Sequence, residues 1–320
     1  MSVDQPGEAD VPPDGTGDQR DDQNDGPAGR ADSVQPETRY RQEYDAELRV
    51  AAALEKSVTR QQAAAREEAA AVKWGEKVEE GRWMWGEYQR RWPPEERAPV
   101  DRSQDPAGSW RGEGNRVLDA AVNGRVEAAC DRLAELERDR ISPALRAVER
   151  QDPDRHLVCF DRRLKDHDRL KEKVHQTIKE SNRSPEQAVS LVPDAIRYTF
   201  QYPEAHYTRG VLADITRLRD QGFKLDKLKN SWSDDQYKGI NSQWINPDSG
   251  QRFEVQFHTR ISFEAKQLTH DAYERLRTRQ ADKFEEIVLE AFQKKITAEV
   301  PAPPGADGIP DFSERGPDAR

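Results

Sequence analysis

The sequence predicts an α+β fold in which helices flank a mixed β-sheet and a helical region precedes it. Near residue 195 the hydrophobic pattern changes from the three-to-four spacing of helices to the alternation of strands, and it changes back after residue 260. Between these points, strand-like and helix-like segments follow one another in the order β-α-β-β-β. Helices followed by such a block and then by further helices indicate an α+β plan.

The composition narrows the classes of function. Of the 320 residues, 35% are charged and only 34% are hydrophobic, and the mean hydropathy is -1.06, so part of the chain is expected not to pack. The net charge of -10 disfavours a general polyanion binder and favours nucleotides over long nucleic acids. No apolar run approaches the roughly 18 residues of a membrane span, and no signal peptide opens the chain. A cytoplasmic protein without a membrane partner is expected.

Neither a zinc site nor a disulfide framework is indicated. Cys130 and Cys159 lack the close spacing of metal ligands, and the six histidines are scattered. The adjacent pair His270 and Asp271 is a weak metal candidate, because the distant His and Asp ligands of a metal hydrolase are missing.

The chain divides into five predicted regions. Residues 1–38 are rich in Asp, Gly and Pro, which predicts a disordered acidic tail, and residues 300–320 have the same character. Residues 39–92 are dense in Ala, Glu, Lys and Arg and predict a long helix or a helical pair. A Pro-, Gly- and Ser-rich linker follows at 93–114, and residues 115–299 form the mixed domain with its leading helix.

The tryptophans of the helical region have two interpretations. They stand at helical spacings, which more often indicates packing than a surface for a partner. We therefore assign no chemistry to Trp74, Trp83, Trp85 and Trp92. A regulatory role or a protein partner remains an expectation for the helices within 39–150.

Each element of the mixed domain has its own signal. An amphipathic helix starts near residue 115 and is bent or restarted by Pro143, and a basic helical run covers 161–181. Alternating β-branched and aromatic residues predict strands, and Gly222 ends the helix between the first two of them. A Pro-Asp-Ser-Gly turn joins the last two strands as a hairpin. The predicted strands are 195–202, 223–228, 239–245 and 251–259, and the predicted helices around them are 203–222, 262–279 and 281–296.

The last predicted strand contains FEVQFHT, at 253–259. Its apolar side chains lie on one face and Glu254, Gln256 and His258 on the other, so the polar face meets solvent, a cleft or a ligand. For an isolated strand, ordinary solvation of Glu254 is the commoner explanation. His258 is better explained as a hydrogen-bonded histidine than as a base, because no Asp or nucleophile stands beside it.

Charged residues recur through the domain in an order that suits a nucleotide. Two carboxylates on adjacent strands, Asp194 and Glu254, can hold Mg²⁺ together with substrate phosphates. Basic side chains around them can neutralise a polyphosphate, and Tyr237 can stack on a base. Each piece alone fits a solvated helix face or the start of a strand, and only their order is informative. The basic residues of this set are Arg163, Lys165, Lys173, Lys227 and Lys229.

From residue 160 to about 279, this order resembles the synthetase domain of the RelA/SpoT family, a branch of the nucleotidyltransferase fold. The matching stretches are RLK at 163–165 with Lys173, DAIRYTF, KNSW, YKGIN and EVQFHT, of which the last is the strongest match. The resemblance implies that Asp194 and Glu254 hold Mg²⁺. It also implies that Glu254 helps to activate the 3′-hydroxyl of an acceptor.

The resemblance assigns further residues to the nucleotides. Arg163 and Lys165 would pack around the donor ATP. Lys173 and Lys229 would contact phosphates, and Tyr237 would stack on the acceptor base. Three more residues would bind nucleotide: Arg197, Asn241 and Gln256.

The chain departs from the family pattern in three places. The family's aspartate stands five residues before the strand arginine, whereas Asp194 stands three before Arg197, so a slipped alignment puts Val192 at the metal position. A shift of two keeps Asp194 on the same strand face. The loop before Tyr237 lacks the family's P-K-x-N-G, and Asn241 stands where a histidine is usual, which leaves the acceptor open.

The implied function is a Mg²⁺-dependent pyrophosphokinase that moves the β,γ-diphosphate of ATP to a nucleotide 3′-hydroxyl. The acceptor would be GDP, GTP or an adenine nucleotide, and the product an alarmone made for signalling or by a toxin. One alternative is a catalytically inactive nucleotide-sensing or protein-interaction module. Another is a toxin that modifies the 3′ end of tRNA, which the acidic composition disfavours.

Overall fold

A computed structural model describes residues 36–56, 60–93, 100–278 and 281–314. Residues 1–35 and 315–320, which hold most of the first predicted tail and the end of the second, lie outside the described residues. The first helix already begins at Pro36, inside the predicted tail. Within the described ranges, no helix is both long and apolar enough to cross a membrane.

The described residues contain the predicted mixed sheet. Its strands lie in the order β3-β4-β7-β6-β5-β8, where β4 and β7 run parallel and all other neighbours run antiparallel. The α+β prediction is therefore confirmed. The strands are β3 (His156–Val158), β4 (Arg197–Tyr202), β5 (Lys224–Asn230), β6 (Ile240–Ile245), β7 (Arg252–Thr259) and β8 (Phe312–Ser313).

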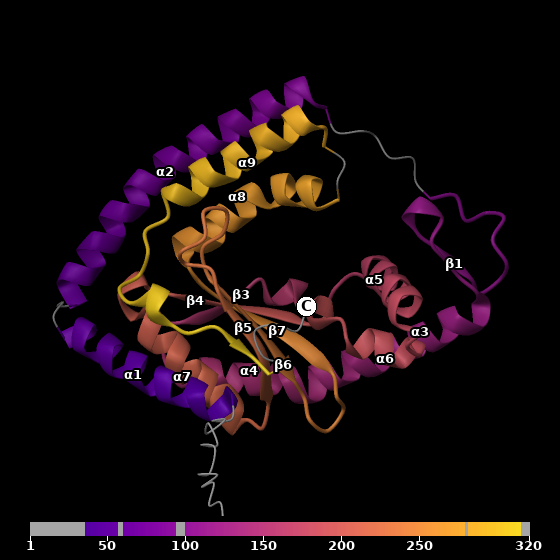
Figure 1. Cartoon of the computed structure of the whole chain (residues 1–320), viewed down its shortest axis with the longest axis horizontal. Helices are drawn as coiled ribbons and strands as arrows, with labels where there is room; N and C mark the ends of the chain where they lie inside the picture. Colours follow the sequence, from indigo (N-terminus) through magenta and orange to yellow (C-terminus); the bar gives the residue numbers. More distant parts are fainter. Residues whose placement is uncertain (1–35, 57–59, 94–99, 279–280, 315–320) are drawn as a thin grey trace, which may run out of the picture. The chain divides into compact units, whose positions relative to one another are not determined.

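Helices pack on both sides of this sheet. In Figure 1, α4 and α7 lie below the sheet and α8 and α9 lie above it, and α7 and α8 each contact β7. The helices are α1 (Pro36–Lys56), α2 (Arg60–Arg91), α3 (Ala120–Leu136), α4 (Ser142–Glu149), α5 (His167–Ser181), α6 (Pro185–Ser190), α7 (Tyr207–Asp220), α8 (Arg260–Arg277) and α9 (Lys283–Ala298).

Strand β7 has the two faces that its alternation predicts. Phe253, Val255 and Phe257 are fully buried and form part of the core. The hydroxyl of Tyr207 on α7 donates to the backbone carbonyl of Phe257 at 2.9 Å, so this apolar face is the one that α7 covers. Burial of three large apolar side chains fixes the register, because a slip of one residue would move them all to the polar face.

The predicted bend near Pro143 is a π-helical turn, Glu137–Ile141, between α3 and α4. Pro143 stands in the first turn of α4, where its missing backbone N–H is not needed. The turn places Glu137, which is fully buried, against the hydroxyls of Ser142 and Tyr198. Gly222 follows the end of α7 with a φ of 85°, as expected for a helix terminator.

The N-terminal helices pack on the mixed domain. The hydroxyl of Tyr44 on α1 lies 2.7 Å from Thr216 Oγ1 on α7. On α2, Trp74 is 2% exposed and its Nε1 donates to Glu264 on α8 at 2.7 Å. Trp74 therefore packs, whereas Trp83 is 64% exposed. Contacts of this kind join the helical region to the sheet in one compact unit.

The prediction of a loose segment from residue 300 is wrong for the described part, 300–314. Val300, Ile309 and Phe312 are buried, and β8 pairs with the edge of β5. The apolar residues of this segment are few and are separated by Pro and Gly, so the composition resembles that of a disordered tail. Composition does not show that these apolar residues pack in the core.

The predicted linker 93–114 also contains structure. A short antiparallel pair joins β1 (Trp110–Arg111) to β2 (Val117–Leu118). Trp110 is 3% exposed, and its Nε1 donates to Asp168 on α5 at 2.8 Å. One buried tryptophan thus anchors a segment whose Pro, Gly and Ser content predicts a linker.

Candidate active site

The polar face of the sheet carries most of the predicted site residues. Strand register aligns two rows of side chains across β4, β7, β6 and β5. Paired residues on neighbouring strands lie about 5 Å apart and share a face. The first row is Arg197, Glu254, Gln243 and Lys227, and the second is Thr199, Gln256, Asn241 and Lys229.

Asp194 lies in a short 3-10 turn, Pro193–Ala195, immediately before β4. Lys165 and Lys173 both donate to its carboxylate, at 2.9 Å from Lys165 and at 2.7 and 2.8 Å from Lys173. Val192, the alternative from a slipped alignment, is 4% exposed and belongs to the core. Of these two positions, Asp194 is the one whose carboxylate faces the basic side chains.

The prediction of one helix over 161–181 is wrong, because a non-helical segment, 163–166, separates the short 3-10 helix Phe160–Arg162 from α5. Leu164 forms an isolated β-bridge with Ile196, and Lys165 N donates to the carbonyl of Ala195 at 3.0 Å. Asp166 then caps α5 by accepting from Arg169 N. The strand-like link explains why Lys165 reaches Asp194, because it runs beside the start of β4.

The electrostatics of Asp194 favour the ionised form. Burial acts to raise its pKa, but the hydrogen bonds and charges of Lys165 and Lys173 outweigh burial and hold the pKa below its usual value. Burial lowers the pKa of Lys165 in turn, and the charges of Lys173 and Arg197 lower it further while Asp194 opposes the change. Several cations thus share one carboxylate.

Glu254 has the opposite character. Burial raises its pKa and the charge of Asp194 adds to the effect, whereas Arg197, the hydrogen bond from Gln256 and the charge of Lys266 act to lower it. The charge of Asp194 thus makes ionisation of Glu254 less favourable. Glu254 is paired with Arg197 in the parallel register of β7 and β4.

This donor set fits Mg²⁺. Among the described residues, no cluster of three or more His, Cys, Asp or Glu side chains could hold a metal ion, so a metal here would take two carboxylates and complete its shell from elsewhere. Mg²⁺ is commonly bound by one or two carboxylates with water and substrate phosphates. A divalent cation held by Asp194 and Glu254 would also offset the effect of the Asp194 charge on Glu254.

Two predicted nucleotide contacts are engaged elsewhere. Arg163 Nε donates to the buried carboxylate of Glu137 at 2.7 Å, and its Nη1 donates to the carbonyl of Phe160 at 3.0 Å. Lys229 is exposed and pairs with Asp234 at 3.1 Å. It lies on β5, two strands away from Gln256 on β7. Neither side chain contacts Asp194.

Tyr237 and Asn241 lie together next to a buried histidine. The Tyr237 hydroxyl donates to Asn241 Oδ1 at 2.9 Å and lies 2.8 Å from His258 Nε2. His258 is fully buried, and its Nδ1 lies 2.9 Å from Ser262 Oγ. Burial lowers the pKa of His258 well below its usual value, so the imidazole is a neutral structural group that fixes Tyr237.

Sequence reasoning missed two cations of α8. Lys266 is half-buried and donates to Gln256 Oε1 on β7, and burial followed by the charge of Arg197 lowers its pKa to about 8. Arg277 pairs with Glu274 and interacts electrostatically with Asp194. Sequence spacing puts Lys266 one helical turn after Ser262 on the same face, but only the structure shows that this face contacts β7 through Ser262 and His258.

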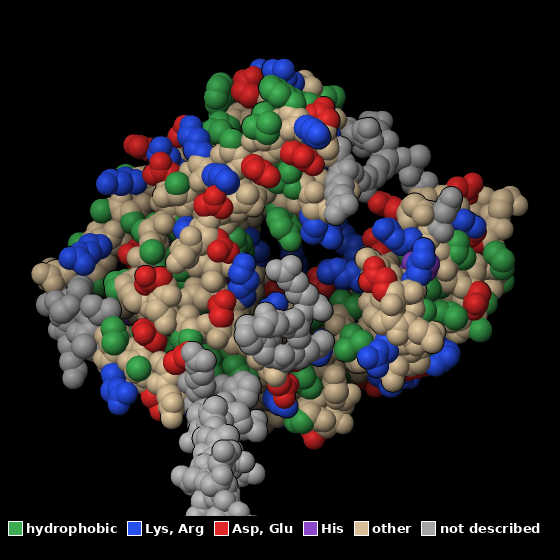
Figure 2. Space-filling view, in the orientation of Figure 1, with side chains coloured by type: hydrophobic (Ala, Val, Ile, Leu, Met, Phe, Trp, Pro, Cys, Tyr) green, Lys and Arg blue, Asp and Glu red, His purple; other side chains and the backbone are tan. Residues whose placement is uncertain are grey.

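These groups line one basic cleft, defined here by Asp194 and Glu254 with the surrounding cations. The cations come from the segment before α5, from α5, from β4 and from α8. In the space-filling view a hollow with Lys and Arg side chains on its wall lies between α8 and α5 (Figure 2). The cations of the basic cleft are Lys165, Lys173, Arg197, Lys266 and Arg277.

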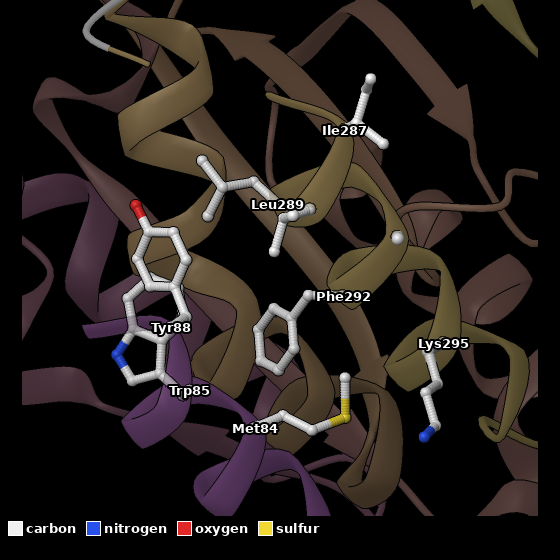
Figure 3. Close-up of a pocket in the computed structure, with 9 residues that line it drawn as sticks. Met84, Trp85, Tyr88, Ile287, Leu289, Phe292 and Lys295 are labelled. Carbon is white, nitrogen blue, oxygen red and sulfur yellow. The ribbon is translucent and has the colours of Figure 1, made fainter. Parts of the chain in front are cut away.

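A separate cavity of about 270 Å³ lies between α2 and α9. Figure 3 shows Trp85 and Tyr88 of α2 opposite Leu289 and Phe292 of α9. Its lining is apolar apart from the Tyr88 hydroxyl and Lys295 and includes no carboxylate. This cavity therefore lacks the groups that the chemistry of the basic cleft needs.

No family model matches the chain, and no curated protein sequence matches it. Among solved structures, it is similar to the crystal structure of the small alarmone synthetase 1 from Bacillus subtilis. The two share 12% sequence identity over 55% of this chain and 88% of that chain, with a TM-score of 0.29. That TM-score is too low for the likeness to establish a shared fold or a shared activity.

Proposed function

We propose that the basic cleft binds ATP with Mg²⁺ and transfers its β,γ-diphosphate to the 3′-hydroxyl of a nucleotide acceptor. The observation that carries this proposal is the placement of two carboxylates, Asp194 just before β4 and Glu254 on the parallel neighbour β7, within a group of five cations. A polyphosphate with a divalent cation complements such a site in charge. Transfer of a phosphoryl-type group depends mainly on positioning and charge stabilisation, which this arrangement supplies.

In the proposed reaction, the acceptor's 3′-oxygen attacks the β-phosphorus of ATP. The bond from that phosphorus to the oxygen that bridges to the α-phosphate breaks, and AMP leaves with the electron pair. The hydroxyl proton passes to Glu254, whose raised pKa suits a group that takes up a proton. Mg²⁺, when bound, would neutralise charge on the phosphates.

The lysines on Asp194 have a second role in this proposal. In the free protein, Lys165 and Lys173 occupy both oxygens of the carboxylate. Phosphate oxygens would draw these ammonium groups away and leave the carboxylate to the metal. Lys165 and Lys173 would thus exchange one anion for another, which preorganises the cleft for an anionic ligand.

A nucleotide-sensing module without catalysis is the second candidate. It is favoured by the closed hydrogen-bond chain of Asn241, Tyr237 and His258, which commits the side chains assigned to the acceptor to one another. Such a module would bind nucleotide at the same cations without transferring a group. Modification of a tRNA end remains a third proposal, which the net charge of -10 disfavours.

A transfer assay separates these candidates. Purified protein is incubated with Mg²⁺, γ-labelled ATP and, in turn, GDP, GTP, AMP, ADP, ATP or bulk tRNA, beside Asp194→Asn and Glu254→Gln. Label on one acceptor with the wild type, and on none with either variant, supports the synthetase and identifies its acceptor. Nucleotide binding without transfer to any acceptor would favour the sensing module.

A further inference from the structure

Lys266 is a cation of the basic cleft that does not contact either carboxylate. Its Nζ donates to Gln256 Oε1, and Gln256 Nε2 donates to Glu254 Oε1. Thr199 Oγ1 also donates to Gln256 Oε1, at 3.4 Å. The side-chain amide of Gln256 thus lies between the ammonium of α8 and the carboxylate of β7.

The hydrogen-bonding chemistry of Lys266 and Glu254 fixes the orientation of the Gln256 amide between them. An ammonium group has only donors, so Lys266 must face the amide oxygen, and an ionised carboxylate has only acceptors, so Glu254 must face the amide nitrogen. A half-turn of the Gln256 amide would put donor against donor at one end and acceptor against acceptor at the other. The two partners therefore permit only one orientation.

Two sets of hydrogen bonds fix the start of α8, the helix that carries Lys266. Thr259 and Ser262 form a capping box at the start of α8, each side chain accepting from the other's backbone N–H. One turn further along, Trp74 of α2 donates to Glu264 at 2.7 Å. Gln256 is 5% exposed, so solvent does not compete strongly for its amide.

We propose that Lys266 is a positioning residue that holds Glu254 in its working orientation through the side-chain amide of Gln256. The role rests on the proposed function, in which Glu254 takes the proton of the acceptor hydroxyl. It adds to that function a residue outside the stretches on which the RelA/SpoT resemblance rests. Lys266 fixes the amide, and the amide holds one oxygen of Glu254 so that the other faces the cleft.

The structural half of the proposal is tested without any reaction. In the side-chain amide NMR spectrum of the full chain, the Nε2 protons of Gln256 should be protected from exchange in the wild type. They should shift and lose protection in Lys266→Met, which keeps the aliphatic stem, and recover in Lys266→Arg. Lys283→Met, an exposed lysine of α9, is the matched control. An unchanged Gln256 signal in Lys266→Met would overturn the proposal.

The functional half is tested by a double-mutant cycle. Lys266→Met should lower kcat for diphosphate transfer on the order of tenfold to a hundredfold, with little change in KM for ATP, because a misplaced base slows the chemical step. In a Gln256→Met background, the same change should have almost no further effect. Thermal unfolding of each variant checks that the chain still folds.

The outcomes separate failure of this inference from failure of the proposed function. The positioning role is overturned if Lys266→Met lowers kcat equally with and without Gln256. It is also overturned if the substitution raises only KM. Either result would mean that Lys266 acts on substrate directly. If the wild type transfers nothing, the proposed function fails, and the functional role of Lys266 falls with it. The Gln256 spectrum then still decides whether the amide is held as described.

Discussion

At the scale of single residues, hydrogen-bond partners decide what the polar face of β7 does. Alternation in FEVQFHT predicts that Glu254, Gln256 and His258 share a face, and this is confirmed. Alternation cannot show that Gln256 and His258 are buried while Glu254 is only half-buried. That difference arises because α8 covers the end of the strand. Alternation along a strand does not predict where a helix packs on it.

The buried His258 should make stability depend on pH. Its folded pKa lies well below the ordinary value of 6.5, so its contribution to stability is present above pH 6.5 and is lost as pH falls below that value. The loss approaches about 1.4 kcal/mol per pH unit while the folded state keeps the ring neutral. Urea unfolding at pH 7.5, 6.5 and 5.5 measures it.

The control for this prediction is a second histidine substitution. His258→Gln should flatten the decline between pH 6.5 and 5.5, whereas His270→Gln, at an exposed position of α8, should leave it intact. If both variants lose stability with the same slope as the wild type, His258 is not the titrating group.

Gly239 should not tolerate a side chain. It has a φ of 145°, and a Cβ would lie 2.6 Å from His258 Cε1 and 3.2 Å from the Phe257 carbonyl oxygen. Gly239→Ala should cost about 2 to 4 kcal/mol through overpacking and backbone strain. Gly124→Ala on α3, where a Cβ meets nothing within 4 Å, is the matched control and should be neutral or stabilising. Chemical denaturation would contradict the prediction if the two variants were equally stable.

At the scale of elements, long segments were predictable and short ones were not. The strands β4, β5, β6 and β7 each carry several alternating residues and match their predicted positions within a few residues. The strands β3 and β8 have three and two residues and exist because a neighbour offers an unpaired edge. Such strands have too few residues to show a period.

The segment with β8 should contribute to stability. Phe312 is 6% exposed and its ring lies 4.9 Å from that of Tyr40 on α1, so Phe312→Ala should cost about 3 kcal/mol or more. Phe284 on α9 is 56% exposed and provides the comparison, because Phe284→Ala removes far less buried surface. The melting temperature should fall clearly in Phe312→Ala and little in Phe284→Ala. Equal melting temperatures in the two variants would mean that the segment contributes as little to stability as a loose tail would.

At the scale of the whole molecule, the site depends on segments that are distant in sequence. Asp194 precedes β4, Glu254 lies on the parallel neighbour β7, and Lys266 comes from α8. Sequence order predicted both carboxylates on adjacent strands, but only Glu254 lies on a strand, and Asp194 lies in the turn just before β4. Sequence order could not predict that Arg163 turns to the buried Glu137, because that contact depends on the π-helical turn between α3 and α4.

The N-terminal helices belong to the same body. Trp74 of α2 donates to Glu264 on α8, the helix that carries Lys266, and α1 packs on α7. These helices therefore contact elements of the domain that contains the basic cleft. A regulatory role or a protein partner for 39–150 remains a proposal. These contacts explain why a helical region of low hydrophobicity has buried aromatic residues such as Trp74 and Tyr44.

Diphosphate transfer to a 3′-hydroxyl is tested by following label from γ-labelled ATP to the acceptor that the panel identifies and to the same acceptor lacking its 3′-hydroxyl. We expect wild-type protein with Mg²⁺ to label the first acceptor and not the second and to release AMP in equal amount, and we expect Glu254→Gln to be inactive. Labelling of the 3′-deoxy acceptor, or full activity in Glu254→Gln, would contradict this expectation.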